Sequence, residues 1–152
     1  MSGLAIKKVE EATMQSNRFH LAITVLDIQE AKKFYCGLLG CTPGNFEKDK
    51  WQDINFWGNE LTLHKSSNIA LRERHDVDMG HVAVPHYGAH LEEEEFQALK
   101  EKIKKSSAEF LDPPYRRFKG DPREQETFFI EDPSGNILEI KTMAQPKTLF
   151  QN

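Results

Sequence analysis

The sequence predicts an α+β fold built from two copies of one small unit. Two observations support this prediction: the order strand, helix, strand, strand occurs twice along the chain, and short repeated motifs align the two copies. With 152 residues, of which 38% are apolar, the chain is long enough for one domain with a substantial core. We expect that domain at residues 18–143, with module one at 18–70 and module two at 81–143, between a flexible N-terminal lead (1–17) and a C-terminal tail (144–152).

The first copy begins with a predicted strand at Phe19–Val25, which has the β-branched and aromatic content of a buried strand. Asp27 is a candidate helix N-cap, because Glu30 follows three residues later and apolar residues then recur at helical spacing up to Gly40. The turn-rich stretch CTPGNFEKDK separates this helix from two short strands joined by Gly58-Asn59, which we expect at Trp51–Trp57 and Glu60–Lys65.

The second copy repeats this order after a charged segment, Arg72–Asp78, that we expect to be a solvated connection. A predicted strand at His81–Leu91, interrupted by Pro85, precedes a helix at Glu92–Lys105. The first turn of this helix is acidic and its last turn is basic, as the helix dipole favours. Loop signals at residues 112–114 and 119–122 follow, and the closing hairpin comprises strands at Thr127–Glu131 and Ile137–Thr142 around the turn Asp132-Pro133-Ser134-Gly135-Asn136.

The two copies align at both ends. Matching Phe19-His20 with Pro85-His86 sets them 66 residues apart, and matching Gly58-Asn59 with Gly135-Asn136 sets the closing hairpins 77 apart. We attribute the difference to a longer loop in the second copy. Helices on the outer side of the strands would leave the inner strand faces free to form a cleft, where function should be sought.

Composition excludes several classes of partner. The net charge is −4 and the basic residues are scattered, which argues against nucleic acid. No apolar run approaches the roughly 20 residues that cross a bilayer, and the N-terminus lacks the hydrophobic core of a secretory signal, so we expect a cytoplasmic protein without a membrane partner. Cys36 and Cys41 form no CxxC pair and are expected to be reduced thiols.

Three residues on predicted strands are candidate metal ligands. His20 and His86 occupy matching positions in the two copies, and Glu139 lies in the last strand, where Leu138 and Ile140 point to the opposite face. Burying a carboxylate is unfavourable unless a positive charge neutralises it, and a metal ion held with both histidines would do so. Taken singly, a histidine or glutamate in a strand is more often a hydrogen-bonded core or rim residue than a ligand, and it is the joint placement of the three that favours a metal site.

These residues lie in segments that resemble the vicinal oxygen chelate superfamily, which includes glyoxalase I, type I extradiol dioxygenases, fosfomycin-resistance proteins and bleomycin-binding proteins. The resemblance extends from Phe19 to Lys141 and is carried by FHLAITVLDIQEAKKFYCGLLGC, QDINFWGNELTLHK, PHYGAHL and FFIEDPSGNILEIK. It implies the glyoxalase/bleomycin resistance/dioxygenase fold, in which two βαβββ modules form a mixed, curved sheet around a metal-binding cleft. It also implies metal ligands at the positions matching His20, His86 and Glu139.

Whether a fourth protein residue binds the metal ion stays open at this point. Pairing Asn59 with Asn136 places Thr62 opposite Glu139, and threonine is an improbable ligand. Glu60 and His64 share the face of Thr62, each two residues away, so a shift of two places would supply a fourth ligand. His81 is the main rival of His86, because HVAV also resembles the start of a metal-bearing strand. His90 and His75 rank below His64 as functional candidates.

The resemblance implies a metal-dependent enzyme that acts on a small vicinal-oxygen molecule. Two histidines and one carboxylate suit Fe(II) and an extradiol-type dioxygenase acting on a catechol-like substrate, with His64 as acid/base. The alternative is a glyoxalase I-like lyase or isomerase with Ni, Zn or Mn, in which Glu60 or His64 moves a proton. A second alternative is a non-catalytic, bleomycin-type binding protein. We expect a homodimer, and the basic loop of Arg116, Arg117 and Lys119 is either an anion contact or a solvated surface.

Overall fold

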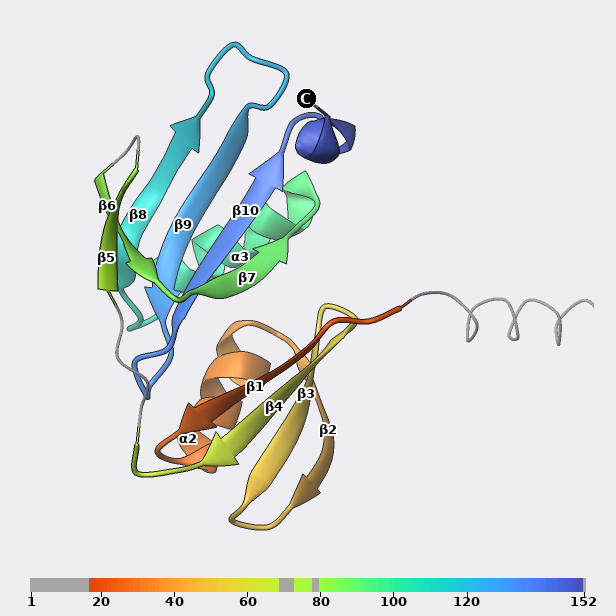
Figure 1. Ribbon diagram of the computed structural model, residues 1–152, viewed down its shortest axis with the longest axis vertical. Helices are drawn as coiled ribbons and strands as arrows, with labels where there is room; N and C mark the ends of the chain where they lie inside the picture. Colours follow the sequence, from red (N-terminus) through yellow and green to blue (C-terminus); the bar gives the residue numbers. More distant parts are fainter. Residues whose placement is uncertain (1–16, 69–72, 78–79, 152) are drawn as a thin grey trace, which may run out of the picture.

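The first half of the chain folds into a four-stranded sheet with one helical segment. We describe a computed structural model in which residues 17–68, 73–77 and 80–151 are placed, so the expected lead lies almost entirely outside the described residues. The sheet has the order β1-β4-β3-β2, and β1 runs parallel to β4 while the other pairs are antiparallel (Figure 1). Its elements are β1 (His20–Val25), α2 (Ile28–Lys32), the π-helical η1 (Lys33–Leu38), β2 (Thr42–Glu47), β3 (Trp51–Phe56) and β4 (Asn59–Lys65).

The second half repeats this topology strand for strand. Its sheet has the order β7-β10-β9-β8, with β7 parallel to β10 and the other pairs antiparallel. The predicted α+β fold of two βαβββ modules is therefore confirmed. The elements are β7 (Tyr87–His90), α3 (Glu93–Lys105), β8 (Phe110–Arg117), β9 (Gln125–Glu131) and β10 (Ile137–Met143), with a separate hairpin, β5 (Glu73–Val77) and β6 (Gly80–Val84), and a closing 3-10 helix, η2 (Pro146–Phe150).

Strand register confirms both sequence alignments at once. Ala22 pairs with Thr62 across β1 and β4, and Gly88 pairs with Glu139 across β7 and β10. Ala22 and Gly88 are 66 residues apart, whereas Thr62 and Glu139 are 77 apart, as the two motif alignments require. The position equivalent to Glu139 in the first module is therefore Thr62.

Several segments differ from the sequence prediction. β2, expected as a turn, is exposed along its whole length and contains a register shift after Pro43, and β8 contains Pro113 and Pro114 within an irregular edge strand. Edge strands tolerate proline because one row of their amide groups faces away from the sheet. The predicted connection Arg72–Asp78 contains strand β5, and the predicted strand His81–Leu91 divides at Pro85 into β6 and β7, which belong to different sheets.

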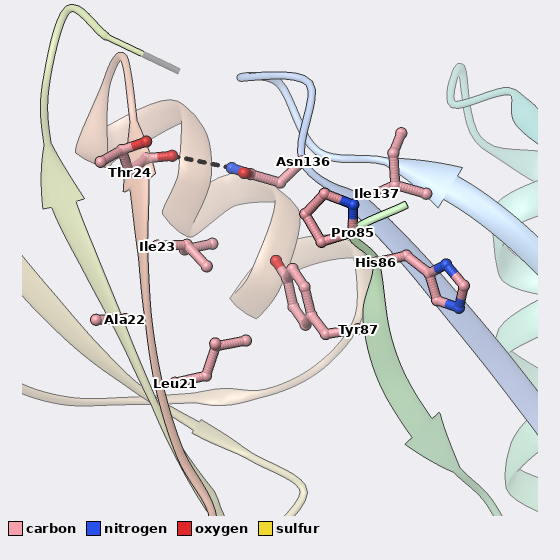
Figure 2. A pocket seen from close by; sticks show the side chains of 9 residues that line it. All are labelled: Leu21, Ala22, Ile23, Thr24, Pro85, His86, Tyr87, Asn136 and Ile137. Carbon is pink, nitrogen blue, oxygen red and sulfur yellow. Dashed lines mark hydrogen bonds between the residues drawn. The ribbon is translucent and has the colours of Figure 1, made fainter. Parts of the chain in front are cut away.

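The turn at Asp132–Asn136, hereafter the clamp turn, joins the two modules. The carboxylate of Asp132 is buried, and it accepts hydrogen bonds from the Tyr35 hydroxyl at 2.8 Å and from the backbone N–H groups of Ser134 and Asn136 at 2.9 and 2.8 Å. The Asn136 amide donates to the Thr24 carbonyl at 2.9 Å (Figure 2). The backbone N–H of Leu26 donates a further hydrogen bond to the Ser134 hydroxyl at 2.8 Å.

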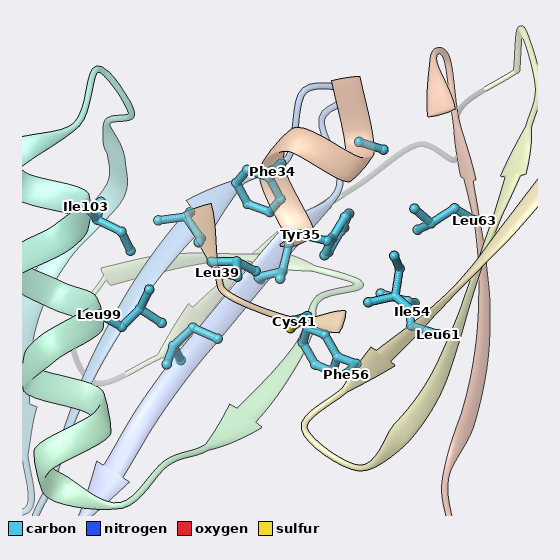
Figure 3. Close-up of a cluster of buried hydrophobic side chains, with 14 of the residues drawn as sticks. Phe34, Tyr35, Leu39, Cys41, Ile54, Phe56, Leu61, Leu63, Leu99 and Ile103 are labelled. Atoms are coloured by element: carbon cyan, nitrogen blue, oxygen red, sulfur yellow. The ribbon is translucent and has the colours of Figure 1, made fainter. Parts of the chain in front are cut away.

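One hydrophobic cluster is shared by both modules (Figure 3). Phe34 and Tyr35 of the first module lie in the same cluster as Leu99 and Ile103 of α3, together with Leu138 from β10. Lys102 of α3 also donates to the carbonyl of Gly37 at 2.8 Å. The apolar, helix-side faces of both sheets thus meet in one core, and the described helices are all too short or too polar to traverse a lipid bilayer.

The clamp turn gives the first testable prediction. Replacing Asp132 by Ala should lower the free energy of unfolding by about 3 kcal/mol, because several buried donors lose their shared acceptor. Tyr35→Phe removes one of these donors and leaves the others paired, so it should cost only about 1 kcal/mol. Urea unfolding of both variants measures the difference, and equal losses would contradict the central role of the carboxylate.

Candidate metal centre

A histidine–carboxylate pair lies on the face of the second sheet that points away from α3, hereafter the inner face. Glu139 of β10 is only 7% exposed, and its Oε2 lies 3.0 Å from His86 Nε2. Its other oxygen, Oε1, accepts a hydrogen bond from the Thr127 hydroxyl at 2.8 Å. Lys141, two residues further along β10, places its Nζ 3.6 Å from the same oxygen. As predicted, Leu138 and Ile140 point to the opposite face and belong to the shared core.

The backbone and a neighbouring aromatic ring fix the orientation of the His86 imidazole. Its Nδ1 lies 2.6 Å from the carbonyl oxygen of Ala83, and the ring packs edge-on against Phe129 with centroids 5.1 Å apart. A hydrogen bond from Nδ1–H to a backbone carbonyl is the usual way in which a protein directs the Nε2 lone pair toward a metal ion. Both ring nitrogens face acceptors, an arrangement that favours the protonated ring.

The electrostatics of this pair agree with its geometry. The hydrogen bond to Glu139 raises the pKa of His86 above 6.5, against the opposing effect of burial. Burial alone would raise the pKa of Glu139, but the hydrogen bond from His86, the charge of Lys141 and the Thr127 hydroxyl together hold it at about 2. Glu139 is therefore a carboxylate, ready to bind a cation, across the physiological pH range.

The first module carries a second pair, His20 and Glu60. These residues lie opposite each other in the register of β1 and β4, and His20 Nδ1 is in direct contact with Glu60 Oε1. Both side chains are more than half exposed. Thr62, which is equivalent to Glu139, instead donates a hydrogen bond to Asp53 at 2.7 Å. The first module thus presents its carboxylate two residues earlier than the second module does.

The two pairs do not form one cluster within the chain. Among the residues that the structure describes, no three His, Cys, Asp or Glu side chains lie close enough to hold one ion. The structure therefore brings His86 together with Glu139, and His20 together with Glu60, but it does not bring His20 to Glu139 in the same chain.

The remaining candidate histidines lie elsewhere. His64 is exposed on β4, four residues or about 13 Å from Glu60 along the strand. His90 lies beside Lys141 at the end of β7, and burial lowers its pKa. His75 is exposed in β5, 3.5 Å from Glu73. His81 belongs to β6, in a different sheet from β7, and its side chain is outside the described part of the chain.

The basic loop is partly engaged in internal contacts. Arg116 lies 3.4 Å from Glu124 and 3.5 Å from Glu126, which is also paired with Lys100. The guanidinium groups of Arg117 and Arg123 lie 4.9 and 4.6 Å from the centre of the Phe118 ring. These contacts hold much of the loop close to its own strands.

A cavity of about 310 Å³ connects His86 with the first module (Figure 2). Leu21 and Ile23 of β1 line one side, and Tyr87 and Ile137 of the second module line the other. The Tyr87 hydroxyl contacts that of the buried Tyr35. Figure 2 shows the Tyr87 side chain pointing toward β1 and the His86 ring pointing away from it, so a small, mainly apolar molecule in the cavity would lie beside Tyr87.

Sequence reasoning missed the role of Gly88. A Cβ atom built on this residue would lie 1.5 Å from the carbonyl oxygen of Glu139, so a side chain there is incompatible with the observed strand spacing. Glycine in the interior of a predicted strand was the available signal, since it often marks such a close approach. Thr127 was also missed, because only the strand register places it opposite Lys141, from where its hydroxyl reaches Glu139.

Comparison with known proteins establishes the family. Residues 18–140 match the model of the Glyoxalase/Bleomycin resistance protein/Dioxygenase superfamily. The chain belongs to this superfamily. Members are often enzymes that use a divalent metal ion, while others are resistance or binding proteins. A search of the curated proteins found no match.

Solved structures of the superfamily share this fold. A glyoxalase/bleomycin resistance protein/dioxygenase from Alicyclobacillus acidocaldarius is 32% identical, with a TM-score of 0.71 over 89% of this chain and 97% of its own. The fosfomycin resistance protein FosX from Listeria monocytogenes is 17% identical, with a TM-score of 0.65 over 90% and 100% of the two chains. A virulence protein from Salmonella typhimurium is 22% identical, with a TM-score of 0.58 over 86% and 100%. At these lower identities, the likeness concerns the fold alone.

Gly88 provides a prediction about the inner face. Gly88→Ala should force β7 away from β10, destabilise the protein by at least about 2 kcal/mol and weaken Mn²⁺ binding by displacing Glu139. Gly37→Ala is the matched control, because a Cβ there meets no atom within 4 Å. Thermal unfolding and a Mn²⁺ titration of both variants test the prediction. Similar behaviour of the two variants would contradict it.

The ion pair predicts a pH dependence of the metal-free protein. Because the pKa of His86 is raised by folding, its contribution to stability is full below 6.5 and declines as the pH rises through the raised pKa. The pKa of Glu139 is lowered, so its contribution is lost as the pH falls from 4.5 toward about 2. The lowered pKa of His90 acts in the opposite direction, so the contribution of His86 is measured as the stability lost in His86→Asn relative to the wild type. In urea unfolding this loss should be larger at pH 5.5 than at pH 8, whereas His64→Asn should show no such dependence. An equal loss at both pH values in His86→Asn would contradict the prediction.

Proposed function

We propose that the protein is a metal-dependent enzyme of the glyoxalase type that acts on a small molecule with two vicinal oxygen atoms. His86 and Glu139 of one chain would bind a divalent ion together with His20 and Glu60 of a second copy. The observation that carries the proposal is the contact between His86 Nε2 and Glu139 Oε2, which lie 3.0 Å apart. Hydrogen bonds to Ala83 and Thr127 fix the two side chains in this position.

The donor set suits a divalent cation. The Ala83 carbonyl orients the His86 ring, the Thr127 hydroxyl occupies one carboxylate oxygen, and the second oxygen faces the imidazole. A neutral imidazole and a carboxylate are common ligands of Zn, Ni, Mn and Fe(II). A cation would also take the place of the proton at His86 Nε2, because Nε2 would then donate its lone pair to the ion.

A homodimer is the arrangement that would complete the site. His20 and His86 occupy equivalent positions in the repeat, but one chain does not bring them to a common ion. The shared core occupies the helix-side faces of both sheets, and Val82 and Ala83 of β6 cover only the part of the inner face at Phe129 and Ile137. The rest of the faces that carry the two pairs stays available to a second molecule. In a two-fold dimer, each module would meet the other module of its partner, and two equivalent centres would form.

The exposed carboxylate of Glu60, which contacts the proposed metal ligand His20, favours the glyoxalase-type reaction because that reaction needs a group that moves a proton. A bound divalent ion would act as a Lewis acid that polarises a carbonyl or enediolate oxygen of the substrate. Glu60 is more than half exposed, and its carboxylate could accept a proton from substrate carbon and return it to the neighbouring atom. His64, about 13 Å further along β4, is less well placed for this role.

An Fe(II) extradiol-type dioxygenase is the second candidate. It would use only His20, His86 and Glu139 as ligands, the two-histidine, one-carboxylate set that leaves positions for a catechol-like substrate and dioxygen. A non-catalytic binding protein, the third class, has no need of two oriented histidine–carboxylate pairs.

Mixed dimers test the proposed composite site. His20→Ala and Glu139→Ala should each abolish tight Mn²⁺ binding, because each homodimer then contains two damaged centres. When both chains are co-expressed and pair at random, half of the dimers contain both variants, and one centre in each of these is intact, so about a quarter of the wild-type Mn²⁺ sites should return. Electron paramagnetic resonance counts the bound Mn²⁺. Failure of the mixture to recover any sites would contradict the composite centre.

Reaction assays distinguish the candidate functions. Isomerisation of thiol hemithioacetals by the Ni(II) or Zn(II) form would support the glyoxalase-type reaction, whereas oxygen uptake with catechols by the Fe(II) form would support the dioxygenase. Protein that retains no stoichiometric metal after dialysis, and regains none on incubation, would support the binding protein.

A further inference from the structure

Lys141 lies next to the proposed metal site, on the other side of the same carboxylate. It follows Glu139 by two residues on β10 and therefore shares the inner face. Its ammonium lies 3.6 Å from Oε1 of Glu139, whereas His86 faces Oε2. The Lys141 side chain is 25% exposed, so solvent screens its charge only partly. One carboxylate thus separates an ammonium group from the position proposed for a divalent ion.

The charges of the completed site do not balance without a further anion. A divalent ion and Lys141 carry three positive charges, and the carboxylates of Glu139 and Glu60 supply two negative ones. One positive charge is left, or two if Glu60 is not within the centre. In a partly buried site, such an excess repels the metal ion and attracts an anionic ligand more strongly than it would in water.

One further cation lies at this end of the inner face. His90 lies beside Lys141 in the register of β7 and β10, but burial and the charge of Lys141 lower its pKa, so its imidazole adds no positive charge at neutral pH. Arg117 pairs with Gln125, which is two residues from Thr127 on β9, so it shares the same face. Two acidic residues share this face. Asp112 pairs with Phe129, the partner of Glu139, and lies 3.8 Å from Arg74, whereas Glu131 pairs with Ile137 at the far end of β9.

We infer that Lys141 selects substrates in which one of the two chelating oxygens belongs to an acidic group, such as a carboxylate or phosphonate. That group would lie between the metal ion and the Lys141 ammonium and neutralise both. Lys141 is then a residue that determines specificity, and it exchanges its contact with Glu139 for a contact with the substrate when the ion binds. The inference rests on the proposed metal site and adds the charge class of its substrate.

A matched pair of small ligands tests this role. Glycolate and glycolamide both present a hydroxyl and a carbonyl oxygen on adjacent carbons, but only glycolate is an anion. Their affinities for the Mn²⁺-loaded protein are measured by calorimetry, and the affinity for Mn²⁺ alone is measured on the metal-free protein. The variants are Lys141→Met, Lys141→Arg, which retains the charge, and Lys33→Met, which removes an exposed lysine paired with Glu30.

Lys141→Met should reduce the preference for glycolate over glycolamide about tenfold and bind Mn²⁺ alone about tenfold more tightly, because it removes a repelling charge. Lys141→Arg and Lys33→Met should resemble the wild type. A purely structural lysine would instead weaken Mn²⁺ binding when replaced.

Two outcomes overturn the role of Lys141 but leave the proposed metal site intact: a preference for glycolate that survives in Lys141→Met, or weaker Mn²⁺ binding by that variant. Wild-type protein that binds no Mn²⁺ overturns the proposed function, and this inference with it.

Discussion

The buried carboxylate of Asp132 is the interaction on which the arrangement of the two modules depends. It gathers the hydroxyl of Tyr35 and the N–H groups of its own turn, and the same turn binds the backbone of Thr24 and Leu26. Burial raises the pKa of Tyr35, which keeps its hydroxyl protonated and able to donate. A short polar turn therefore fixes how two apolar faces meet, and it directs the polar faces of both sheets away from the common core.

The pair of His86 and Glu139 shows how such a polar face can be tolerated in a small protein. Desolvation opposes the charge on Glu139, and three neighbours of different kinds offset it: an imidazole, a hydroxyl and an ammonium. Removing one partner of such a buried pair is usually more destabilising than never having formed it. The protein therefore holds a negative charge in place at a position that suits a cation.

Much of the fold could be predicted from the sequence, because apolar periodicity and repeated motifs are local signals. The matching of His20 with His86, and of Thr62 with Glu139, followed from counting residues, and the strand register confirms it. The edge strands β2 and β8 were not predicted from their residues, since prolines and exposure mask their pairing, and β5 looked like a charged connection. Of the site, the structure brings His86 and Glu139 into contact, and their role as metal ligands stays a prediction. The contact of His20 with Glu60 required the register of a parallel strand pair, which no spacing along the chain reveals.

The spacing between β7 and β10 has a consequence for how this protein can vary. Gly88 has no functional group, yet any side chain at that position would collide with the main chain of Glu139. An inherited substitution at this inert residue would thus be as harmful to the centre as the loss of a donor atom. Mutational tolerance around the carboxylate is limited by backbone proximity as much as by chemistry.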